Sequence, residues 1–177
     1  MNPEEARRNG LPEISFELSY PSNMIFEPAK AGEKNYNYAT FYLLDEAGNR
    51  SDMVSVGYYT MEGDDGQTID VLNEQLIGQI RNIYRSSFDL SYEFSGKRSF
   101  YGKEYPMYQA IGSIDRAEAQ FVGTYYIQAM LIRPTPSAGT GLVFIFQSNE
   151  NAGIFALSDI GAKGCSSIIW SSLKFKE

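Results

Sequence analysis

The chain has 177 residues, of which 43% are hydrophobic and 21% are charged, and its formal net charge is −7. This length suits one domain whose core folds without disulfides or a structural metal, and this composition excludes an intrinsically disordered chain. The acidic balance excludes the basic stripe with which nucleic-acid-binding proteins neutralise phosphates, so no nucleic-acid partner is expected. No apolar run reaches the roughly 18 residues that indicate a transmembrane helix.

The polar first residues predict a flexible lead-in over 1–12, followed by a single domain over 13–177. They lack the apolar core of a signal peptide, which indicates a cytoplasmic protein as the sequence stands. A polar leader is also typical of what remains when a signal peptide is removed, and then the cell envelope or secretion is expected. Cys165 is the only cysteine, so an internal disulfide is excluded and a reducing compartment fits.

The first third of the chain predicts strands. Strict alternation of apolar and polar residues indicates the first one, which ends at Pro21 because proline cannot donate to a strand ladder. A loop is expected over 22–33, and the turn-forming residues 45–49 join the next two strands into a hairpin. The predicted strands are 14–20, 36–44 and 53–61.

Two later segments have helical spacing instead. The apolar stripe that includes Leu72, Leu76 and Ile80 predicts a helix over about 69–86. A second helix is expected over 155–169, packed on the sheet, with its glycines allowing close backbone approach. Both helices carry one apolar stripe, so each is expected to cover a face of the sheet.

Between these helices the pattern returns to strands. Polar turns are expected at 95–97, 115–117 and 134–139, and Pro106 indicates a sheet edge or a break in its strand. Short turns between consecutive strands predict antiparallel pairing, and hence an α+β fold. The predicted strands are 88–94, 99–112, 121–133 and 142–147, with a short closing strand over 173–175.

The chain contains no histidine, which removes the commonest general base, the histidine-based triads and most zinc sites. Cys165 has no histidine to activate it and lies among small and apolar residues, which predicts a buried, unreactive thiol. No phosphate-binding glycine motif follows a predicted strand. We therefore predict no catalytic residue, no cofactor and no enzyme; an enzyme with two facing carboxylates, such as a glycosidase, is the alternative.

The acidic loop 62–70 offers oxygen ligands of the kind that Ca²⁺ prefers. Its candidate ligands are Glu62, Asp64 and Asp65. The EF-hand pattern does not fit, because aligning Gly66 with the invariant glycine puts apolar residues at both end positions. A solvated loop and a weak cation site are both compatible with the sequence.

The chain has 13 tyrosines, several of them adjacent or closely spaced. Neighbouring strand residues point to opposite faces, so one tyrosine of each adjacent pair lies off the main core unless helices cover both faces. Exposed tyrosine is typical of interfaces, because it buries a large ring and still forms a hydrogen bond. The candidate binding residues are Tyr58, Tyr101, Tyr105, Tyr108 and Tyr125.

Three segments, taken in order, carry a family resemblance. Residues 16–24 read as an opening strand followed by Tyr-Pro, with Met24 where relatives often have tryptophan. Residues 101–105 are a glycine-led hairpin after the central helix, and 168–175 are a closing helix with a serine-hydrophobic-lysine signature. On these motifs the chain resembles the PsbP/Mog1-like superfamily, including its bacterial DcrB-like members. The resemblance implies an antiparallel sheet sandwiched between helices, an α-β-α sandwich.

The resemblance also implies a largely non-enzymatic family of photosystem assembly factors, a Ran-binding factor and bacterial chaperone-like or envelope proteins. Metal sites proposed for some members rely partly on histidine, which this chain lacks. We therefore predict a non-catalytic binding or assembly module with a protein partner or self-association. The alternative is a small-ligand or Ca²⁺-binding domain that uses exposed tyrosines or the acidic loop 62–70.

Overall fold

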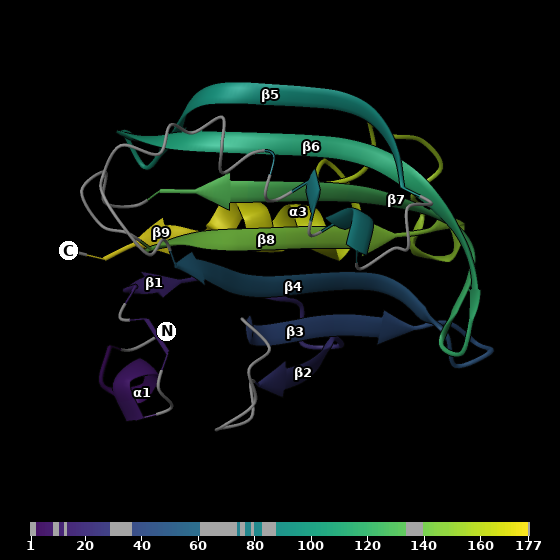
Figure 1. The fold of residues 1–177 in the computed structure, drawn as a ribbon. Coiled ribbons are helices and arrows are strands. Elements are labelled where there is room, and N and C mark those ends of the chain that lie inside the picture. Colours follow the sequence, from purple (N-terminus) through teal and green to yellow (C-terminus); the bar gives the residue numbers. More distant parts are fainter. Residues whose placement is uncertain are drawn as a thin grey trace.

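The structure is a computed structural model. It describes residues 3–8, 11–12, 14–28, 37–60, 74, 77–78, 80–82, 88–133 and 140–176. Strands dominate this part of the chain (Figure 1). The elements are α1 (Pro3–Arg8), β1 (Phe16–Glu17), β2 (Ile25–Pro28), β3 (Asn37–Leu44), β4 (Arg50–Thr60), β5 (Asp89–Phe100), β6 (Lys103–Glu118), β7 (Phe121–Ile132), β8 (Thr140–Ser148), the 3₁₀ turn η1 (Glu150–Ala152), α3 (Gly164–Ser172) and β9 (Lys174–Phe175).

Seven strands form one antiparallel sheet in the order β2-β3-β4-β8-β7-β6-β5. Strand β8 lies in the middle and joins the β3–β4 hairpin to the meander of β5, β6 and β7 (Figure 1). Strands β1 and β9 pair separately as a two-stranded ribbon. The antiparallel sheet, the first hairpin and the closing strand predicted from the sequence are confirmed.

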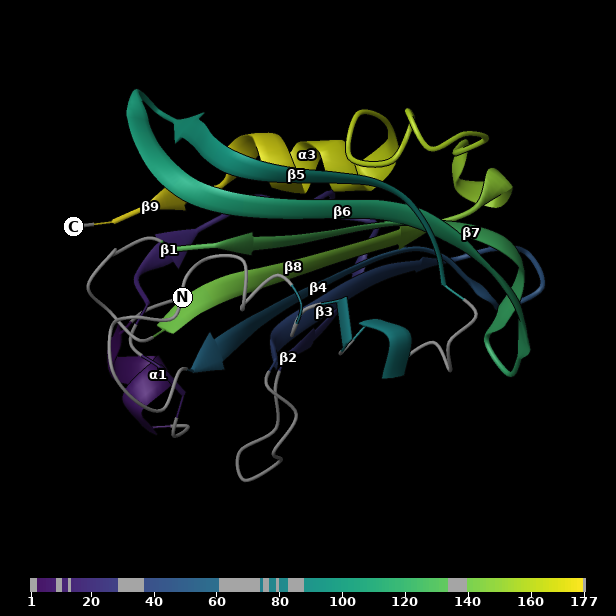
Figure 2. The same cartoon turned by 45° about the horizontal axis from the view of Figure 1, so that its top comes forward.

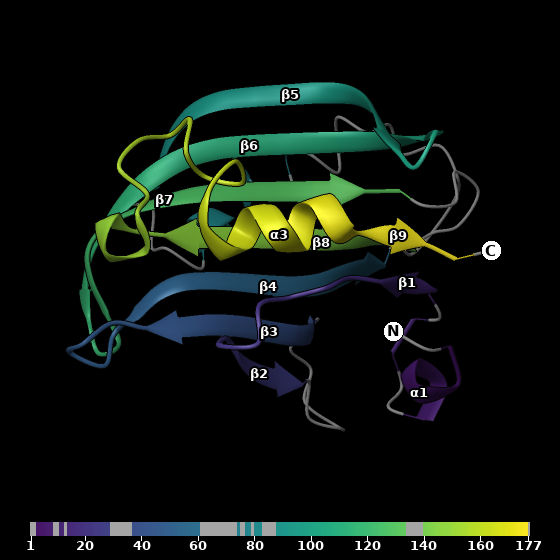
Figure 3. The same cartoon turned by 180° about the vertical axis from the view of Figure 1, so that it is seen from behind.

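The two faces of the sheet carry separate cores. Phe144 and Val143 are neighbours on β8 and belong to different apolar clusters, because adjacent strand residues point to opposite faces. Helix α3 covers the Phe144 face, contributing Ile169 to its core (Figure 3). On the other face, the described positions within 74–82 are helical, and Ile77 packs against the second core. Figure 2 shows these helical pieces and α3 on opposite sides of the sheet.

The predicted sandwich is confirmed in its sheet but not in its helical layers. Besides the helical residues within 74–82, the described helices are α1, α3 and the short η1. The helix predicted over 69–86 is therefore supported at its described positions, and its ends lie outside the described residues. No helix in the described part of the chain is long and apolar enough to span a membrane.

Two of the polar turns predicted in the meander lie inside strands, whereas the reversal at Tyr101–Gly102 is in the hairpin that the family motif over 101–105 implies. Residues 95–97 are inside β5 and residues 115–117 are inside β6, while the chain reverses at Tyr101–Gly102 and after Glu118. Strand β5 is at the edge of the sheet and is mostly exposed, so polar residues are as favourable there as in a turn. Exposure, not chain reversal, accounts for the polar residues at 95–97. At 115–117, Asp115 is exposed, whereas the mostly buried Arg116 side chain donates to Oε1 of Gln147 at 2.9 Å.

Pro106 lies in an unbroken strand at the point where its pairing with β7 ends, so the prediction of a break is wrong and that of a local edge is correct. Strand β6 pairs with β5 on one side and with β7 on the other. The missing N–H interrupts no bond of the β6–β7 ladder, because β7 ends at Ile132, one residue short of Pro106 in register. The Pro106 carbonyl still accepts a hydrogen bond from the Arg133 N–H.

The last helix begins at Gly164, not near residue 155 as the sequence predicts. Gly161 and Gly164 have φ values of +73° and +68°, which are left-handed and incompatible with a continuing helix. The close approach expected of these glycines is confirmed at Gly161, where a Cβ atom would lie 2.2 Å from Oε1 of Gln128. This glycine brings the loop before α3 against the sheet.

Two N-terminal elements are not predicted by the sequence. Residues 25–28 form the edge strand β2, although a loop is predicted over 22–33; all four residues are exposed, so their pattern carries no alternation. Helix α1 lies within the predicted lead-in, and its Ala6 is fully buried. The division into a lead-in over 1–12 and a single domain over 13–177 stays a prediction.

Candidate binding site

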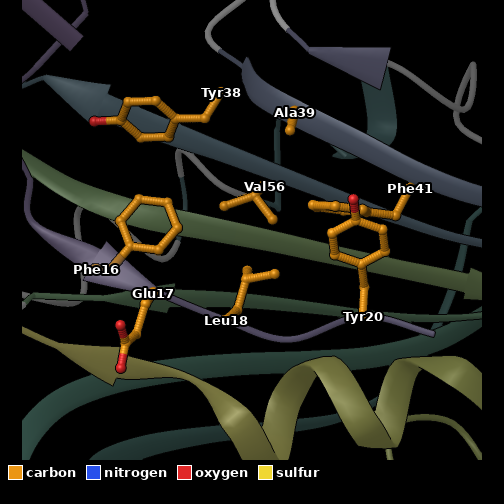
Figure 4. A pocket seen from close by; sticks show the side chains of 8 residues that line it. All are labelled: Phe16, Glu17, Leu18, Tyr20, Tyr38, Ala39, Phe41 and Val56. Atoms are coloured by element: carbon orange, nitrogen blue, oxygen red, sulfur yellow. The ribbon is translucent and has the colours of Figure 1, made fainter. Parts of the chain in front are cut away.

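The segment over residues 14–20 crosses the α3 face of the sheet and forms one wall of the site (Figure 4). Ile14 and Phe16 are buried and Leu18 packs against the same core, as the alternation predicts. Only two of these residues have strand geometry, because β9 is short and pairs with Phe16 and Glu17 alone.

Helix α3 holds the far end of this segment. The Ser19 N–H donates to Oγ of Ser172 at 2.8 Å, and that hydroxyl lies 3.1 Å from the Ser19 carbonyl oxygen. One side chain at the end of α3 therefore contacts both backbone polar groups of Ser19. This contact keeps the segment extended where no strand partner is present.

A β-bulge shapes the opposite wall. The register of β3 with β4 shifts between Asn37 and Ala39, which leaves Tyr38 as the extra residue. Residues 38 and 41 of a regular strand point to opposite faces, but Tyr38 and Phe41 both face the same core as Ala39. The bulge thus places aromatic rings at two positions along one face of β3.

A hollow of about 220 Å³ lies between these two walls (Figure 4). Phe16 and Tyr38 lie edge to face at one end, with their ring centroids 5.5 Å apart. Tyr20 and Phe41 lie at the other end, with centroids 4.6 Å apart. The hollow is lined by Phe16, Glu17, Leu18, Tyr20, Tyr38, Ala39, Phe41 and Val56.

Two polar side chains of the lining, Glu17 and Tyr38, form their bonds outside the hollow. The Glu17 carboxylate accepts a hydrogen bond from the Lys176 ammonium at 2.7 Å, and this bond together with the ammonium charge lowers the pKa of Glu17. In Figure 4 the Glu17 side chain points away from the rings toward β9. The Tyr38 hydroxyl donates to the Pro12 carbonyl oxygen at 2.7 Å, and burial raises the pKa of Tyr38. The interior of the hollow is therefore largely apolar.

An aromatic cluster adjoins the hollow at the β2 edge of the sheet. We define it as Tyr20, Phe26 and Phe41, whose ring centroids are 4.6 to 6.0 Å apart. Phe41 is buried, whereas Tyr20 is 42% exposed and Phe26 is 48% exposed. Solvent thus reaches two large rings that pack on a buried third. Exposed aromatic rings held by a buried support are typical anchors of protein–protein interfaces.

The five tyrosines predicted as binding residues do not come together. Tyr105, Tyr108 and Tyr125 are buried in the cores. The Tyr108 hydroxyl donates to the Glu93 carboxylate, and the Tyr125 hydroxyl donates to the Arg50 carbonyl oxygen at 2.9 Å. Burial first, and then Glu93, raise the pKa of Tyr108.

The remaining two tyrosines lie on different parts of the molecule. Tyr101 is 65% exposed at the β5–β6 turn, with the Lys174 ammonium 4.7 Å from its ring centroid. Tyr58 is partly buried and packs on Tyr38, with centroids 5.3 Å apart. Tyr58 is thus the predicted residue nearest to the hollow, and the role of all five in binding stays a prediction.

The candidate Ca²⁺ ligands Glu62, Asp64 and Asp65 lie outside the described residues. Within the described ranges, no three side chains of histidine, cysteine, aspartate or glutamate are grouped so as to hold a metal ion. The acidic loop therefore stays a prediction.

One buried carboxylate lies elsewhere, below the start of α3. Asp52 on β4 accepts hydrogen bonds from the Ser148 hydroxyl at 2.6 Å and from the Cys165 N–H at 3.0 Å. Cys165 is partly buried, and burial first, and then Asp52, raise the pKa of its thiol to about 11. This thiol is largely protonated at neutral pH, which agrees with the predicted unreactive cysteine.

No protein-family model matches the chain, and no curated protein matches it in sequence. Solved structures do match. The solution structure of cyanobacterial PsbP (CyanoP) from Synechocystis sp. PCC 6803 is similar, with a TM-score of 0.55 and 15% identity over 92% of this chain and 87% of that one. The chain has the PsbP/Mog1-like fold. The resemblance that its sequence motifs carry is therefore confirmed, whereas the two helical layers that it implies are not.

A second similar structure also has this PsbP/Mog1-like fold. It is the crystal structure of LpqN, involved in cell envelope biogenesis of Mycobacterium tuberculosis, with a TM-score of 0.56 and 12% identity. The match covers 92% of this chain and 83% of that one. Identities this low show the fold alone, because unrelated functions share folds.

The orientation of some residues in the site could be predicted from the sequence, and that of others could not. Alternation marks Phe16 and Leu18 as inward-facing, which is correct. Tyr38 has no such signal, because a bulge that reverses its direction leaves no trace in the apolar pattern. Phe26 is in a predicted loop, so its exposure beside Tyr20 follows only from the pairing of β2 with β3.

Proposed function

We propose that this chain is a non-catalytic binding module that engages a protein partner through the aromatic cluster at its β2 edge. The observation that carries the proposal is the pair of exposed rings, Tyr20 and Phe26, supported from below by the buried Phe41. Rigid aromatic side chains bury a large area on binding at a low cost in conformational entropy.

The surroundings of the cluster support this proposal. The edge strand itself is short, with four residues ending at Pro28. We therefore propose contact through side chains rather than through an added strand, because a short edge that ends in proline offers few free backbone groups.

The experiment compares two variants with the natural chain. Tyr20→Ser combined with Phe26→Ser removes both exposed rings, and Tyr92→Ser is the matched control, since Tyr92 is equally exposed on the opposite edge strand β5. Affinity capture from the source cells should retain one partner on the natural chain and on the control but not on the double variant. With the purified partner, calorimetry should show at least a tenfold loss of affinity.

Two results would contradict the proposal. A partner that binds the double variant as well as it binds the natural chain excludes the aromatic cluster as its site. Light scattering that shows a dimer in the natural chain and a monomer only in the double variant identifies a second copy as the occupant. Thermal unfolding of all three proteins shows whether the substitutions change folding rather than binding.

The compartment is part of this proposal. We propose the cell envelope, supported by the PsbP/Mog1-like fold that the chain shares with LpqN, which is involved in cell envelope biogenesis. Fractionation of cells that express the tagged chain from its natural gene tests this location, and recovery in the cytoplasm alone contradicts it.

Small-ligand binding is the second candidate function. The apolar hollow beside the aromatic cluster favours it, because apolar pockets with few polar groups are the usual sites of small ligands. At about 220 Å³ the hollow is smaller than a drug-sized pocket, so the ligand it suits is also small. Binding of Ca²⁺, the other part of this alternative, depends on acidic residues of the loop 62–70 that lie outside the described ranges.

A further inference from the structure

We infer that the hollow between residues 14–20 and the β3–β4 hairpin binds an uncharged, unbranched alkyl chain of roughly six to eight carbons. The inference rests on the second proposed function, small-ligand binding, and names its ligand class. Size, shape, polarity and opening each support it.

The volume of the hollow limits the length of the alkyl chain that it can hold. An apolar cavity of about 150 Å³ stays dry and accommodates benzene, which has six carbons. The hollow has about 220 Å³, which in proportion gives an upper limit of roughly nine carbons, so a chain of six to eight fits within it. A hollow of this size is too small for a sugar or nucleotide together with its hydration.

The shape favours a linear group over a ring. The two ring pairs at the ends belong to Tyr38 and Phe41, which are three residues apart on β3 and hence roughly 10 Å apart along the strand. Val56 and Leu18 lie between them in Figure 4 and narrow the middle of the hollow from opposite walls. The space is therefore elongated along β3.

The polarity excludes a charged ligand inside the hollow. Glu17 is the one ionisable carboxylate among the lining residues, and its charge is balanced by Lys176. The Tyr38 hydroxyl is already bonded to the Pro12 carbonyl. A charged head group inside the hollow would lose its hydration and face mainly apolar side chains, whereas a hydrocarbon has no such cost.

The exposure of the end rings shows where the ligand enters. Phe16 is 5% exposed and Tyr20 is 42% exposed, so the hollow is closed at the Phe16 end and open at the Tyr20 end. The polar end of the ligand would then remain in solvent beside the aromatic cluster, with the alkyl chain reaching toward Phe16.

The first experiment titrates the natural chain with 1-hexanol, 1-octanol and cyclohexanol and follows its methyl resonances by NMR. The methyl signals of Val56 and Leu18 should shift saturably, and those of Leu131, in the other core, should stay in place. Affinity should rise about fourfold for each added methylene until the hollow is full. Cyclohexanol binding more tightly than 1-hexanol would overturn the linear shape.

The second experiment fills the hollow by substitution. Ala39→Leu occupies it from β3 and should weaken 1-octanol binding at least tenfold, while Ala117→Leu, the same change at an exposed position of β6, should leave binding unchanged. If Ala39→Leu fails to fold, Leu18→Phe fills the hollow from the other wall. Equal binding by the natural chain and a folded filled variant would overturn the inference.

The outcomes separate this inference from the proposed functions. A different small molecule that shifts Val56 while the alcohols do not would contradict only the ligand class. The absence of any saturable shift at Val56 would contradict both the ligand class and small-ligand binding in this hollow. The protein-binding function has its own test, since Ala39→Leu leaves Tyr20 and Phe26 unchanged.

Discussion

At the scale of single residues, one aspartate joins the sheet to the helix that covers it. The carboxylate of Asp52 contacts Ser148 on the next strand of the sheet and the backbone of Cys165 in the first turn of α3. An anion beside the first turn of a helix is favourable, because unpaired N–H groups concentrate positive potential there. Gly164 permits this contact, since a Cβ atom there would lie 3.2 Å from the Asp52 Oδ2 atom.

The titration of Asp52 predicts a pH dependence. Burial raises its pKa more than the bonds from Ser148 and Cys165 lower it, so the folded chain binds this proton more tightly than the unfolded chain. Its contribution to stability is therefore greatest below the unfolded pKa of about 3.9 and is lost as the pH rises through the raised folded pKa. Urea unfolding should show the natural chain losing stability relative to Asp52→Asn from about pH 4 upward.

Other carboxylates act in the opposite direction. The pKa of Asp45 is lowered by its hydrogen bond from the Asn49 N–H, and that of Asp159 by its bond from Lys163. The stabilisation by Asp45 and Asp159 is present above their unfolded pKa and is lost as the pH falls. This loss is the same in the natural chain and in Asp52→Asn. The difference between the two proteins therefore isolates Asp52, with Asp115→Asn as an exposed control. Parallel curves for the natural chain and Asp52→Asn would refute the prediction.

At the scale of elements, the β5–β6 hairpin shows how a two-residue turn determines register. Tyr101 and Gly102 both have left-handed φ values, +51° and +81°, as a tight hairpin of this type requires. The turn aligns Phe100 with Lys103 and maintains pairing up to Asp89 through one irregularity near Leu90. The polar residues predict a turn at 95–97 as well, because glycine and polar residues occur in both segments, whereas the family motif over 101–105 marks the hairpin correctly.

The turn leads to a prediction with an internal control. Gly102→Ala should lower the free energy of unfolding by about 1 to 2 kcal/mol, because an L-residue is strained at this φ. Gly78→Ala should raise the free energy of unfolding by up to about 1 kcal/mol, since Gly78 is helical with no left-handed φ. Apart from the glycine's own neighbours in the chain, no heavy atom of the described residues lies within 4 Å of the added Cβ in either case, so chemical denaturation compares backbone effects. If both substitutions change the free energy of unfolding in the same direction, this explanation by backbone conformation is wrong.

At the scale of the whole molecule, the two edges of the sheet differ in length and charge. Strand β5 is 12 residues long and mostly exposed, and it carries Asp89, Glu93, Lys97 and Arg98. Charged side chains on a long edge prevent other strands from pairing with it. The opposite edge, β2, is short and carries the exposed Phe26. The molecule thus shields one edge with charge and leaves apolar side chains at the other.

This asymmetry predicts the effect of removing charge from β5. Lys97→Ile combined with Arg98→Ile should cause self-association that increases with protein concentration, because a long edge without charge pairs with other strands. Light scattering measures the mass, and Lys163→Ile, an equally exposed lysine in a loop, is the control. A double variant with the same mass as the natural chain at all concentrations would show that charge does not protect this edge.

The sequence by itself determined which segments alternate and which chemistries are impossible. Alternation depends on a period of two residues that any half-buried strand repeats, so the inward side of Phe16 and Leu18 and the β3–β4 hairpin could be predicted. The lack of histidine is a property of composition and needs no structure. The PsbP/Mog1-like fold followed from the order of three short motifs.

Only the tertiary structure decided where the candidate site lies. The hollow forms between residues 16–20 and a strand more than 15 positions later, and it depends on the bulge at Tyr38, which the apolar pattern cannot reveal. The burial of Tyr105, Tyr108 and Tyr125 depends on which strands lie at the edge, and strand order is set by pairing between distant segments. Exposure is a property of the assembled sheet, so the tyrosine count could not identify the exposed rings.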